Sequence, residues 1–214
     1  MRAILLPALR VTLVTWVLCG IVYPLAVTGF GQWLLPDQAN GSLLRKPDGT
    51  VVGSRLIGQD WIGPGWFHGR PSATTATDPT DPNKTVSAPY NAAASGASNL
   101  GPTSRALAER LIADRKAAEA SQPELAGRQL PSDMLTTSGS GLDPDISPAY
   151  ARLQVPRVAA ARGLAADQVA ALVRNNTVGR SLGVFGEPRV NVLQLNLSLQ
   201  EMTKASRSEG LRQR

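Results

Sequence analysis

The chain has 214 residues, a length that suits one domain with appended segments. Its formal net charge is +6, but the basic residues are scattered and do not interleave with aromatic ones, so we expect no nucleic-acid partner. The single cysteine, Cys19, excludes an internal disulfide bond and a cysteine metal cluster.

An uncharged, apolar stretch occupies residues 11–35 and predicts a transmembrane helix with interfacial residues at its end. A helix of about 20 residues crosses the ~30 Å hydrocarbon layer of a bilayer. Proline breaks a helix in water, but a membrane helix accommodates it where a neighbouring helix or a local rearrangement satisfies the freed carbonyl. The residues that define the predicted span are Val11, Trp16, Tyr23, Pro24 and Phe30.

Arg2 and Arg10 precede this span, and no acidic residue does. The positive-inside rule therefore places residues 1–10 in the cytoplasm and residues 36–203 outside it, as one extracytoplasmic domain. A cleaved signal peptide is an alternative, but the apolar run is long for a signal core and residues 26–28 are a poor cleavage site. A lipoprotein signal is disfavoured because large residues precede Cys19.

The first part of the predicted domain consists of turn signals, short apolar runs and one long polar segment. Residues 42–44 and 50–54 flank the turn Pro47-Asp48-Gly49 and predict a β-hairpin. Residues 71–104 form a long polar loop without clear periodicity, and such loops are usually functional or disordered. Within it, Asp78 and Asp81 either ligate calcium or belong to repeated Asp-Pro turns.

Three helices are expected in the middle of the chain. The first covers residues 103–120, with Thr103 as its cap. The second begins at Ser147 and Pro148, is kinked or split at Pro156, and stops at Gly163. The third covers residues 165–175 and turns three apolar side chains inward, those of Val169, Leu172 and Val173.

Residues 189–199 alternate between apolar and polar side chains and predict a half-buried strand near the C-terminus. Four leucines would face inward, and the outward face would carry Gln194, Asn196 and Ser198. Together the elements predict an α+β domain with a small mixed sheet. A basic tail at residues 204–214 is expected to be solvated and frayed.

The stretch Thr136-Thr137-Ser138-Gly139-Ser140-Gly141 has the small and hydroxyl-bearing residues of a possible active site. The chain has one histidine, so its only conceivable triad is Ser140, His68 and Asp143. Ser138 stands where a nucleophile elbow requires glycine, and the nearby Arg70 disfavours an imidazolium. The same stretch lacks the lysine of a phosphate-binding loop. We therefore expect no catalytic residue, no metal and no tightly bound cofactor, with a membrane-anchored serine hydrolase as the alternative.

Seven stretches resemble, in order and over nearly the whole chain, the C subunit of the Kdp-type potassium-transporting ATPase. They are residues 40–42 (NGS), 53–59 (GSRLIGQ), 66–74 (WFHGRPSAT), 95–103 (SGASNLGPT), 136–149 (TTSGSGLDPDISPA), 154–163 (QVPRVAAARG) and 186–200 (GEPRVNVLQLNLSLQ). The chain departs from the usual family pattern at Ala97, at Ser104, and at Asp145, where a histidine is common.

The resemblance implies an accessory subunit of an ATP-driven potassium uptake complex in the bacterial inner membrane. Its implied partners are a channel-like A subunit, a P-type ATPase B subunit, a small single-span subunit and membrane lipid, with ATP and K⁺ used by the whole complex. The family role is a catalytic chaperone that raises the ATP affinity of the B subunit. Because the charge pattern places the domain across the membrane from that ATP, we expect this effect to be allosteric.

The resemblance also singles out candidate structural or partner-contact residues in its matching stretches. They are Gln59, Phe67, Arg70, Pro71, Ser72, Asn99, Ser138, Gly139, Ser140, Gly141, Asp143 and Pro144. The stretch 136–147 is expected to be a structured loop or partner surface rather than a catalytic site. Trp61, Trp66 and Phe67 are expected in the core or at its rim.

Overall fold

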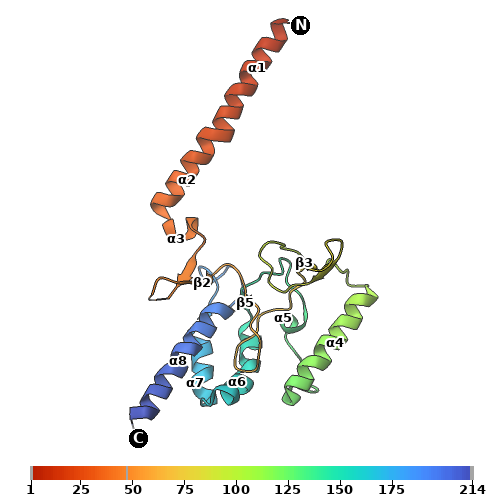
Figure 1. The fold of residues 1–214 in the computed structure, drawn as a ribbon, viewed down its shortest axis with the longest axis vertical. Coiled ribbons are helices and arrows are strands. Elements are labelled where there is room, and N and C mark those ends of the chain that lie inside the picture. Colours follow the sequence, from red (N-terminus) through yellow and green to blue (C-terminus); the bar gives the residue numbers. More distant parts are fainter. Residues whose placement is uncertain (1, 47, 213–214) are drawn as a thin grey trace. The chain divides into compact units, whose positions relative to one another are not determined.

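A computed structural model describes residues 2–46 and 48–212, with side chains described between residues 4 and 206. Pro47 of the predicted turn, residues 213 and 214 of the predicted tail and the side chain of Arg2 lie outside these limits. The chain divides into two compact units, Met1–Ser54 and Arg55–Arg214, and each is described by itself (Figure 1).

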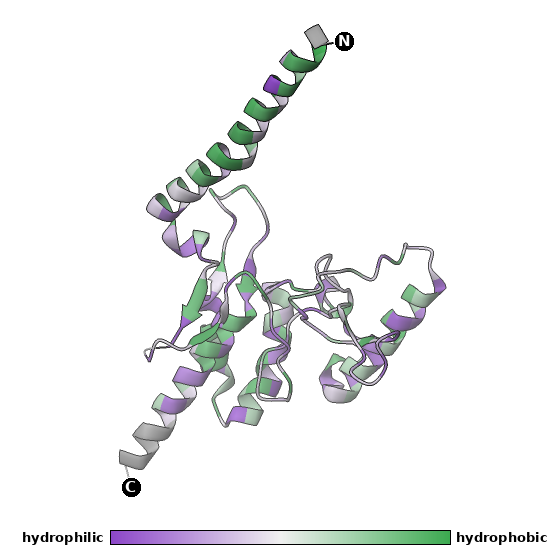
Figure 2. Cartoon of the chain, turned by 45° about the horizontal axis from the view of Figure 1, so that its top comes forward, coloured by the Kyte–Doolittle hydropathy of each residue, from purple (hydrophilic) through white to green (hydrophobic). Residues whose placement is uncertain are grey.

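The first unit begins with a continuous helical run, formed by α1 (Arg2–Val17), a π-helical turn (Leu18–Val22) and α2 (Tyr23–Leu34). Its segment Ile4–Leu34 is long and apolar enough to cross a membrane, and Figure 2 shows the apolar character along it. The helix predicted for residues 11–35 is therefore present, although it begins well before Val11. At its far end Phe30 and Trp33 make an edge-to-face contact, with ring centroids 6.1 Å apart.

The π-helical turn lies immediately before α2, and Pro24 occupies the first turn of α2. The N–H of Tyr23 donates to the carbonyl of Leu18, five residues earlier, instead of four. Such widened turns are typical of places where a helix adjusts to a residue that cannot donate a hydrogen bond. Pro24 thus sits beside the kind of local rearrangement that the sequence predicted.

The first unit ends in the predicted β-hairpin. After the short helix α3 (Pro36–Ala39), β1 (Leu43–Arg45) pairs antiparallel with β2 (Val51–Ser54). Leu43 lies opposite Ser54, and the Ser54 hydroxyl donates to the Gly41 carbonyl at 2.7 Å. The hairpin therefore brings Ser54, the last residue of β2, back beside Gly41, which precedes β1.

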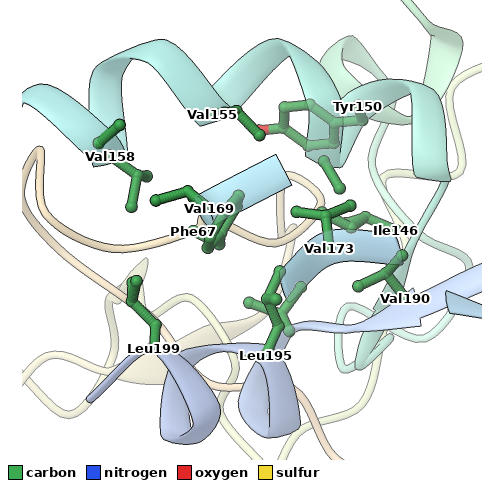
Figure 3. Close-up of a cluster of buried hydrophobic side chains, with 13 residues drawn as sticks. Phe67, Ile146, Tyr150, Val155, Val158, Val169, Val173, Val190, Leu195 and Leu199 are labelled. Carbon is green, nitrogen blue, oxygen red and sulfur yellow. The ribbon is translucent and has the colours of Figure 1, made fainter. Parts of the chain in front are cut away.

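The core of the second unit lies between helices and a three-stranded antiparallel sheet. The strand order is β5 (Asp145–Ile146), β7 (Arg189–Asn191), β6 (Thr177–Val178), so β7 is central. Figure 3 shows apolar side chains of α6 (Pro148–Arg162) and α8 (Val192–Arg212) meeting around Phe67. The α+β class is confirmed, and the strand pairs of the described residues are antiparallel rather than mixed.

The caps predicted for α6 are present. The Ser147 hydroxyl accepts from the Tyr150 N–H, Pro148 occupies the first turn, and Gly163 ends the helix with φ +64°. The expected split at Pro156 does not occur, because the helix is continuous to Arg162. Pro156 and Arg152, whose carbonyl loses its partner, are both exposed, so water can satisfy that carbonyl. The next helix, α7 (Ala166–Asn175), buries Val169 and Val173 as predicted.

The predicted strand at residues 189–199 is wrong beyond Asn191. Strand β7 ends there and α8 begins at Val192, with Asn191 Oδ1 accepting from the Gln194 N–H at 3.1 Å. The leucines at every second position fit a strand, but Val192, Leu195 and Leu199 also have helical spacing, and all three are buried. Asn196, predicted to face solvent, is fully buried. The helical backbone continues to Arg212, through most of the segment predicted to be frayed.

The segment predicted as a polar loop contains a second hairpin, β3 (Thr75–Thr77) paired with β4 (Thr85–Ser87). Asp78 accepts from the Thr80 N–H at 2.7 Å and Asp81 from the Asn83 N–H at 3.1 Å, so both carboxylates form local turns. Within the described residues there is no group of three or more metal-ligating side chains. The Asp-Pro turns predicted for this segment are present.

A long peripheral helix, α4 (Arg105–Ser121), follows this segment. Its N-cap is Ser104 instead of the predicted Thr103, and the Ser104 hydroxyl accepts from the Leu107 N–H. The short helices η2 (Pro123–Leu125) and α5 (Ser132–Leu135) lead from it toward the stretch at residues 136–147.

Candidate functional site

Two buried amide side chains hold the segment Phe67-His68 between α6 and α8. Asn196 of α8 accepts from the Phe67 N–H and donates to the Phe67 carbonyl, both at 2.9 Å. Gln154 of α6 accepts from the His68 N–H at 2.7 Å and donates to the His68 carbonyl at 3.0 Å. Each amide thus pairs with a peptide as a neighbouring strand would, which satisfies backbone groups that no sheet reaches.

Two arginines of α6 hold the turn that precedes this segment. Arg157 donates to the carbonyls of Pro64 at 2.7 Å and Trp66 at 3.1 Å, and also to Gln154 Oε1 at 2.7 Å. Arg162 donates to the Gly65 carbonyl at 2.7 Å, and its guanidinium lies 4.0 Å from the ring centroid of Trp66. The aromatic cluster predicted at the rim of the core is therefore fixed by cation–π and carbonyl contacts.

A cavity of about 490 Å³ lies between α4, α6 and this turn. His68, Arg157 and Gln154 line its polar side, and Ala117 and Met134 line its apolar side. The polar atoms that face it already have partners, because His68 Nε2 lies 2.9 Å from the Gly63 carbonyl and Arg157 is bonded to carbonyls. The cavity therefore offers an incoming ligand few free hydrogen-bonding groups.

Arg70 connects the next segment to the stretch 136–147. Its Nη1 lies 3.2 Å from Asp143 Oδ2, and its Nη2 donates to the Thr136 hydroxyl and the Thr137 carbonyl, both at 3.3 Å. The Arg70 carbonyl accepts from the Tyr90 hydroxyl at 2.7 Å. Arg70 therefore pairs with an acidic residue and with a backbone carbonyl of the stretch 136–147.

Ser72 lies at the centre of a second group of contacts. Its hydroxyl donates to the Gly141 carbonyl at 2.8 Å and accepts from the Tyr90 N–H at 3.0 Å. The neighbouring Thr74 donates to the Ala88 carbonyl at 2.6 Å and accepts from the Asn91 N–H at 3.1 Å. Three segments that are distant in sequence, around residues 70–74, 88–96 and 136–147, are therefore joined by side-chain hydrogen bonds.

Ser140 takes part in this network mainly through its backbone. Its carbonyl accepts from the Gly96 N–H at 2.9 Å and from the Ser95 hydroxyl at 3.0 Å. Its own hydroxyl accepts from the Leu142 N–H at 3.1 Å and so forms a local turn. Ser138 is buried, and its N–H donates to the Pro71 carbonyl at 3.3 Å.

The conceivable triad is not assembled. In the described hydrogen bonds His68 contacts Gly63 and Gln154, whereas Ser140 contacts Ser95, Gly96 and Leu142. The carboxylate of Asp143 pairs with Arg70, so it does not orient the imidazole. This geometry supports the prediction of a structured loop.

Burial perturbs several titratable groups around this network. It raises the pKa of Tyr150 to about 12 and raises that of Tyr90 further, so both phenols stay protonated and act as donors. Burial also raises the pKa of Asp145, although a hydrogen bond from Asn191 and the nearby Arg189 oppose this effect. Asp145 Oδ2 lies 3.1 Å from Arg189 Nε, so the two residues form an ion pair.

Burial of His68 is expected to make the folded chain less stable in acid. Desolvation is the main cause that lowers the pKa of His68 below its ordinary 6.5, and Arg157 adds to it. As the pH falls, His68 is therefore protonated in the unfolded chain before it is protonated in the folded chain. The stabilisation that neutral His68 gives the folded state is complete above pH 6.5 and is lost below it. We expect the wild type to lose more stability between pH 7.5 and 5.5 than His68→Gln, measured by urea unfolding. Equal losses would contradict this assignment.

The remaining predicted residues occupy supporting positions. Gln59 is half-buried, Asn99 and Gly139 are exposed, and Pro144 accepts from the Val192 N–H at 2.9 Å through its carbonyl. Asn99 adopts a positive φ of 52°, which asparagine tolerates better than most residues. The structure also identifies residues that the sequence reasoning missed: Thr74, Tyr90, Gln154, Arg157 and Asn196. The one available signal was an amide among the apolar residues of a predicted helix, and it applied to Gln154.

These features define a class of protein: an α+β domain that follows one helix long and apolar enough to cross a membrane. The sequence model of the K⁺-transporting ATPase c chain (KdpC) family matches residues 5–201. The chain is 57% identical over 198 residues to the potassium-transporting ATPase KdpC subunit of Rhodopseudomonas palustris strain BisB5, covering 92% of this chain and 96% of that protein. It is 58% identical over 193 residues to the KdpC subunit of Bradyrhizobium diazoefficiens, covering 90% and 94%. The chain therefore belongs to the family of the K⁺-transporting ATPase c chain.

Proposed function

We propose that this chain is the membrane-anchored accessory subunit of a high-affinity, ATP-driven potassium uptake complex and that it acts by binding partner subunits. The observation that carries the proposal is the helix Ile4–Leu34, whose apolar side chains are exposed along its length. Such a surface requires lipid or the helices of other subunits. Family membership and the names of the relatives, which are potassium-transporting ATPase subunits, support the same assignment.

The proposed partners are a channel-like, potassium-binding A subunit, a P-type ATPase B subunit and a small single-span subunit. The hydrogen-bond network supports a role without chemistry of its own, because the polar groups of residues 66–74 and 136–147 largely bond to one another. ATP and K⁺ are then ligands of the complex, and this chain binds no cofactor tightly.

The proposed location is the bacterial inner membrane, with residues 1–10 in the cytoplasm and the second unit outside. The exposed apolar helix and Arg10, which lies in the N-terminal part of that helix, support this orientation. A domain on the outer side of the membrane cannot contact ATP in the cytoplasm. It would change the ATP affinity of the B subunit through a coupling free energy between the two sites. The catalytic chaperone effect is therefore proposed to be allosteric, with the A subunit as the contact through which it passes.

Co-purification tests the accessory-subunit proposal. We expect a C-terminally tagged chain, solubilised from native membranes in mild detergent, to recover a large multi-span protein and a P-type ATPase. A variant that lacks residues 2–34 and carries a cleavable secretion signal is expected to lose both partners. A second variant, in which an unrelated apolar helix of equal length replaces residues 4–34, separates anchoring from recognition. A fully active pump reconstituted without this chain would overturn the proposal.

Replacement of Ser140 tests the hydrolase alternative. We expect Ser140→Ala to leave potassium-dependent ATP turnover of the assembled complex within about twofold of the wild type, since surface changes away from special features have small effects. The Ser140 hydroxyl is exposed and bonds only to its own turn in the described contacts, so its loss changes little. A fall on the order of a thousandfold, the scale of a lost catalytic group, would overturn the assignment of residues 136–147 as a loop without a catalytic residue. His68→Gln provides the second test, because a hydrolase would lose its only base.

A further inference from the structure

The membrane helix contains one widened turn, the π-helical turn Leu18–Val22, in the middle of its apolar run. This turn joins α1 to α2 without a break (Figure 1). The apolar segment extends from Ile4 to Leu34, so its midpoint falls within this turn. None of the residues of the turn is buried within the described part of the chain. In a bilayer the turn therefore lies near the middle of the hydrocarbon layer, far from both layers of headgroups.

The π-helical turn leaves the backbone carbonyl of Cys19 without its usual donor. A helical carbonyl accepts from the N–H four residues later, or five residues later in a π-helical turn. For Cys19 these positions are Tyr23 and Pro24. The Tyr23 N–H donates to the Leu18 carbonyl, and proline has no N–H. The Cys19 carbonyl therefore has no N–H donor at either position.

A second polar group, the Tyr23 hydroxyl, lies at nearly the same depth. Helical side chains point back toward the N-terminus, so the Tyr23 ring lies over the turn that holds the Cys19 carbonyl. Tyr23 is 66% exposed, and its hydroxyl has no partner among the described hydrogen bonds. Tyrosine in membrane proteins is enriched at the two interfaces, where water reaches its hydroxyl. Tyr23 instead adds a second unpaired polar group near the middle of the span.

Lipid cannot satisfy these two groups, whereas a polar side chain of another membrane helix can. Lipid tails carry no hydrogen-bond donor and the bilayer core holds no water, so an unpaired carbonyl is costly there. Hydroxyl and amide side chains commonly form hydrogen bonds between membrane helices. Widened helical turns also occur frequently at functional sites. The two groups therefore favour a polar contact with a neighbouring transmembrane helix over contact with lipid alone.

A second copy of this chain fits the site poorly. Membrane helices approach closely where small residues line their interface. In a parallel pair of identical helices, the two Tyr23 rings would meet at the same depth and hold the helices apart. The hydroxyl of Thr15, one turn before Cys19, already donates to the Val11 carbonyl of its own helix. A different polypeptide, with a small residue opposite Tyr23 and a free donor beside it, fits better.

We propose that a transmembrane helix of a partner subunit packs against residues 18–24 and carries a hydroxyl or amide side chain near the middle of the bilayer. This side chain donates to the Cys19 carbonyl and bonds to the Tyr23 hydroxyl. The inference rests on the proposed function, because it requires that the chain assembles with such a subunit. The polar contact sets the depth at which the two helices meet, as a single polar residue sets the register of other helix pairs.

Isotope-edited infrared spectroscopy tests the contact at the Cys19 carbonyl. Because the chain has a single cysteine, cysteine labelled with carbon-13 at its carbonyl marks this one position. We expect the labelled band to move to lower frequency when the chain is combined with unlabelled partner subunits, since a new hydrogen bond weakens the carbonyl. In Pro24→Ala the band should lie at lower frequency with or without partners, because alanine restores an N–H to the helix. An unchanged wild-type band on assembly would overturn the proposal.

Two variants test the energetic role in co-purification under increasing detergent stringency. Tyr23→Phe removes the hydroxyl, and Pro24→Ala lets the helix satisfy its own carbonyl. We expect each to weaken retention of the partner roughly threefold to tenfold, the scale of one hydrogen bond between membrane helices. The matched controls are Thr15→Val, whose hydroxyl bonds within its own helix, and Pro7→Ala, near the start of α1 where water is available. Both controls should retain the partner as the wild type does.

Photo-crosslinking identifies the occupant of the site. A benzophenone amino acid replaces Trp16, which is 77% exposed and lies one turn before Cys19, and native membranes are irradiated before purification. We expect an adduct with another membrane-spanning polypeptide. Adducts with lipid alone or with a second copy of this chain would overturn the proposal. If the wild type and all four variants retain the partner equally, the inference fails while the proposed function stands. If the wild type itself recovers no partner, the proposed function fails and the inference fails with it.

Discussion

Replacing Asn196 by alanine is expected to lower the free energy of unfolding by about 4 kcal/mol, because two buried backbone groups each lose a hydrogen bond and remain unsatisfied. Both groups belong to Phe67, which is fully buried, and the Asn196 side chain is fully buried as well. Alanine leaves a space lined by the Phe67 peptide and by apolar neighbours. Urea unfolding of the full chain in detergent, followed by circular dichroism, measures the loss.

The matched control is Gln194→Ala on the same helix. Gln194 is also an amide, but it is half-buried, so its truncation is expected to cost less than about 1 kcal/mol. In thermal unfolding, Asn196→Ala should lower the melting temperature by roughly 10 °C, given the usual scaling for a domain of this size. A loss for Asn196→Ala no larger than that of the control would contradict the assignment, since it would mean that water replaces the amide without cost.

Local signals predicted the elements that depend on neighbouring residues. Ser147 followed by Pro148 identified the start of α6, and Gly163 its end, because caps are satisfied within one turn of the chain. The apolar stretch ending near Leu34 predicted a helix long and apolar enough to cross a membrane, because such a run can be recognised from adjacent residues alone. The leucine-rich segment after Asn191 was misassigned, since its apolar residues satisfy a period of two as well as the helical period.

The candidate site could be predicted only in part, because its contacts are long-range. The sequence indicated a structured loop at residues 136–147. It could not indicate that Gln154 would reach the peptide of His68, 86 residues earlier, or that Asn196 would reach Phe67, 129 residues earlier. Such pairs leave no periodic pattern, since each requires one amide at one position.

These long-range pairs have a consequence for assembly. The helices of the core hold residues 67 and 68. In the segment that follows them, the side chains of Arg70 and Ser72 bond to the stretch 136–147. A partner that contacts that stretch therefore meets a surface whose position is set by the core. Rigidity of this kind favours a protein-binding role, because little conformational entropy is lost on docking.

Replacing Gly141 by alanine is expected to destabilise the domain by about 3 kcal/mol or more, through the left-handed backbone conformation and steric overlap together. Gly141 has φ +68°, and a Cβ atom there would lie 2.4 Å from Thr74 Cγ2 and 2.8 Å from the Gly96 carbonyl oxygen. Neither neighbour can move freely. Thr74 is buried with its hydroxyl bonded to Ala88, and the Gly96 N–H is bonded to Ser140.

Gly139→Ala is the control, two residues earlier in the same stretch. No atom lies within 4 Å of a Cβ built there, so its stability should stay within about 1 kcal/mol of the wild type in the same urea titration. If Gly141→Ala were as stable as Gly139→Ala, the stretch would have to shift without cost, and it could not be a rigid surface. A silent Ser140→Ala beside a strongly destabilising Gly141→Ala would show that this stretch acts through its shape rather than through a reactive hydroxyl.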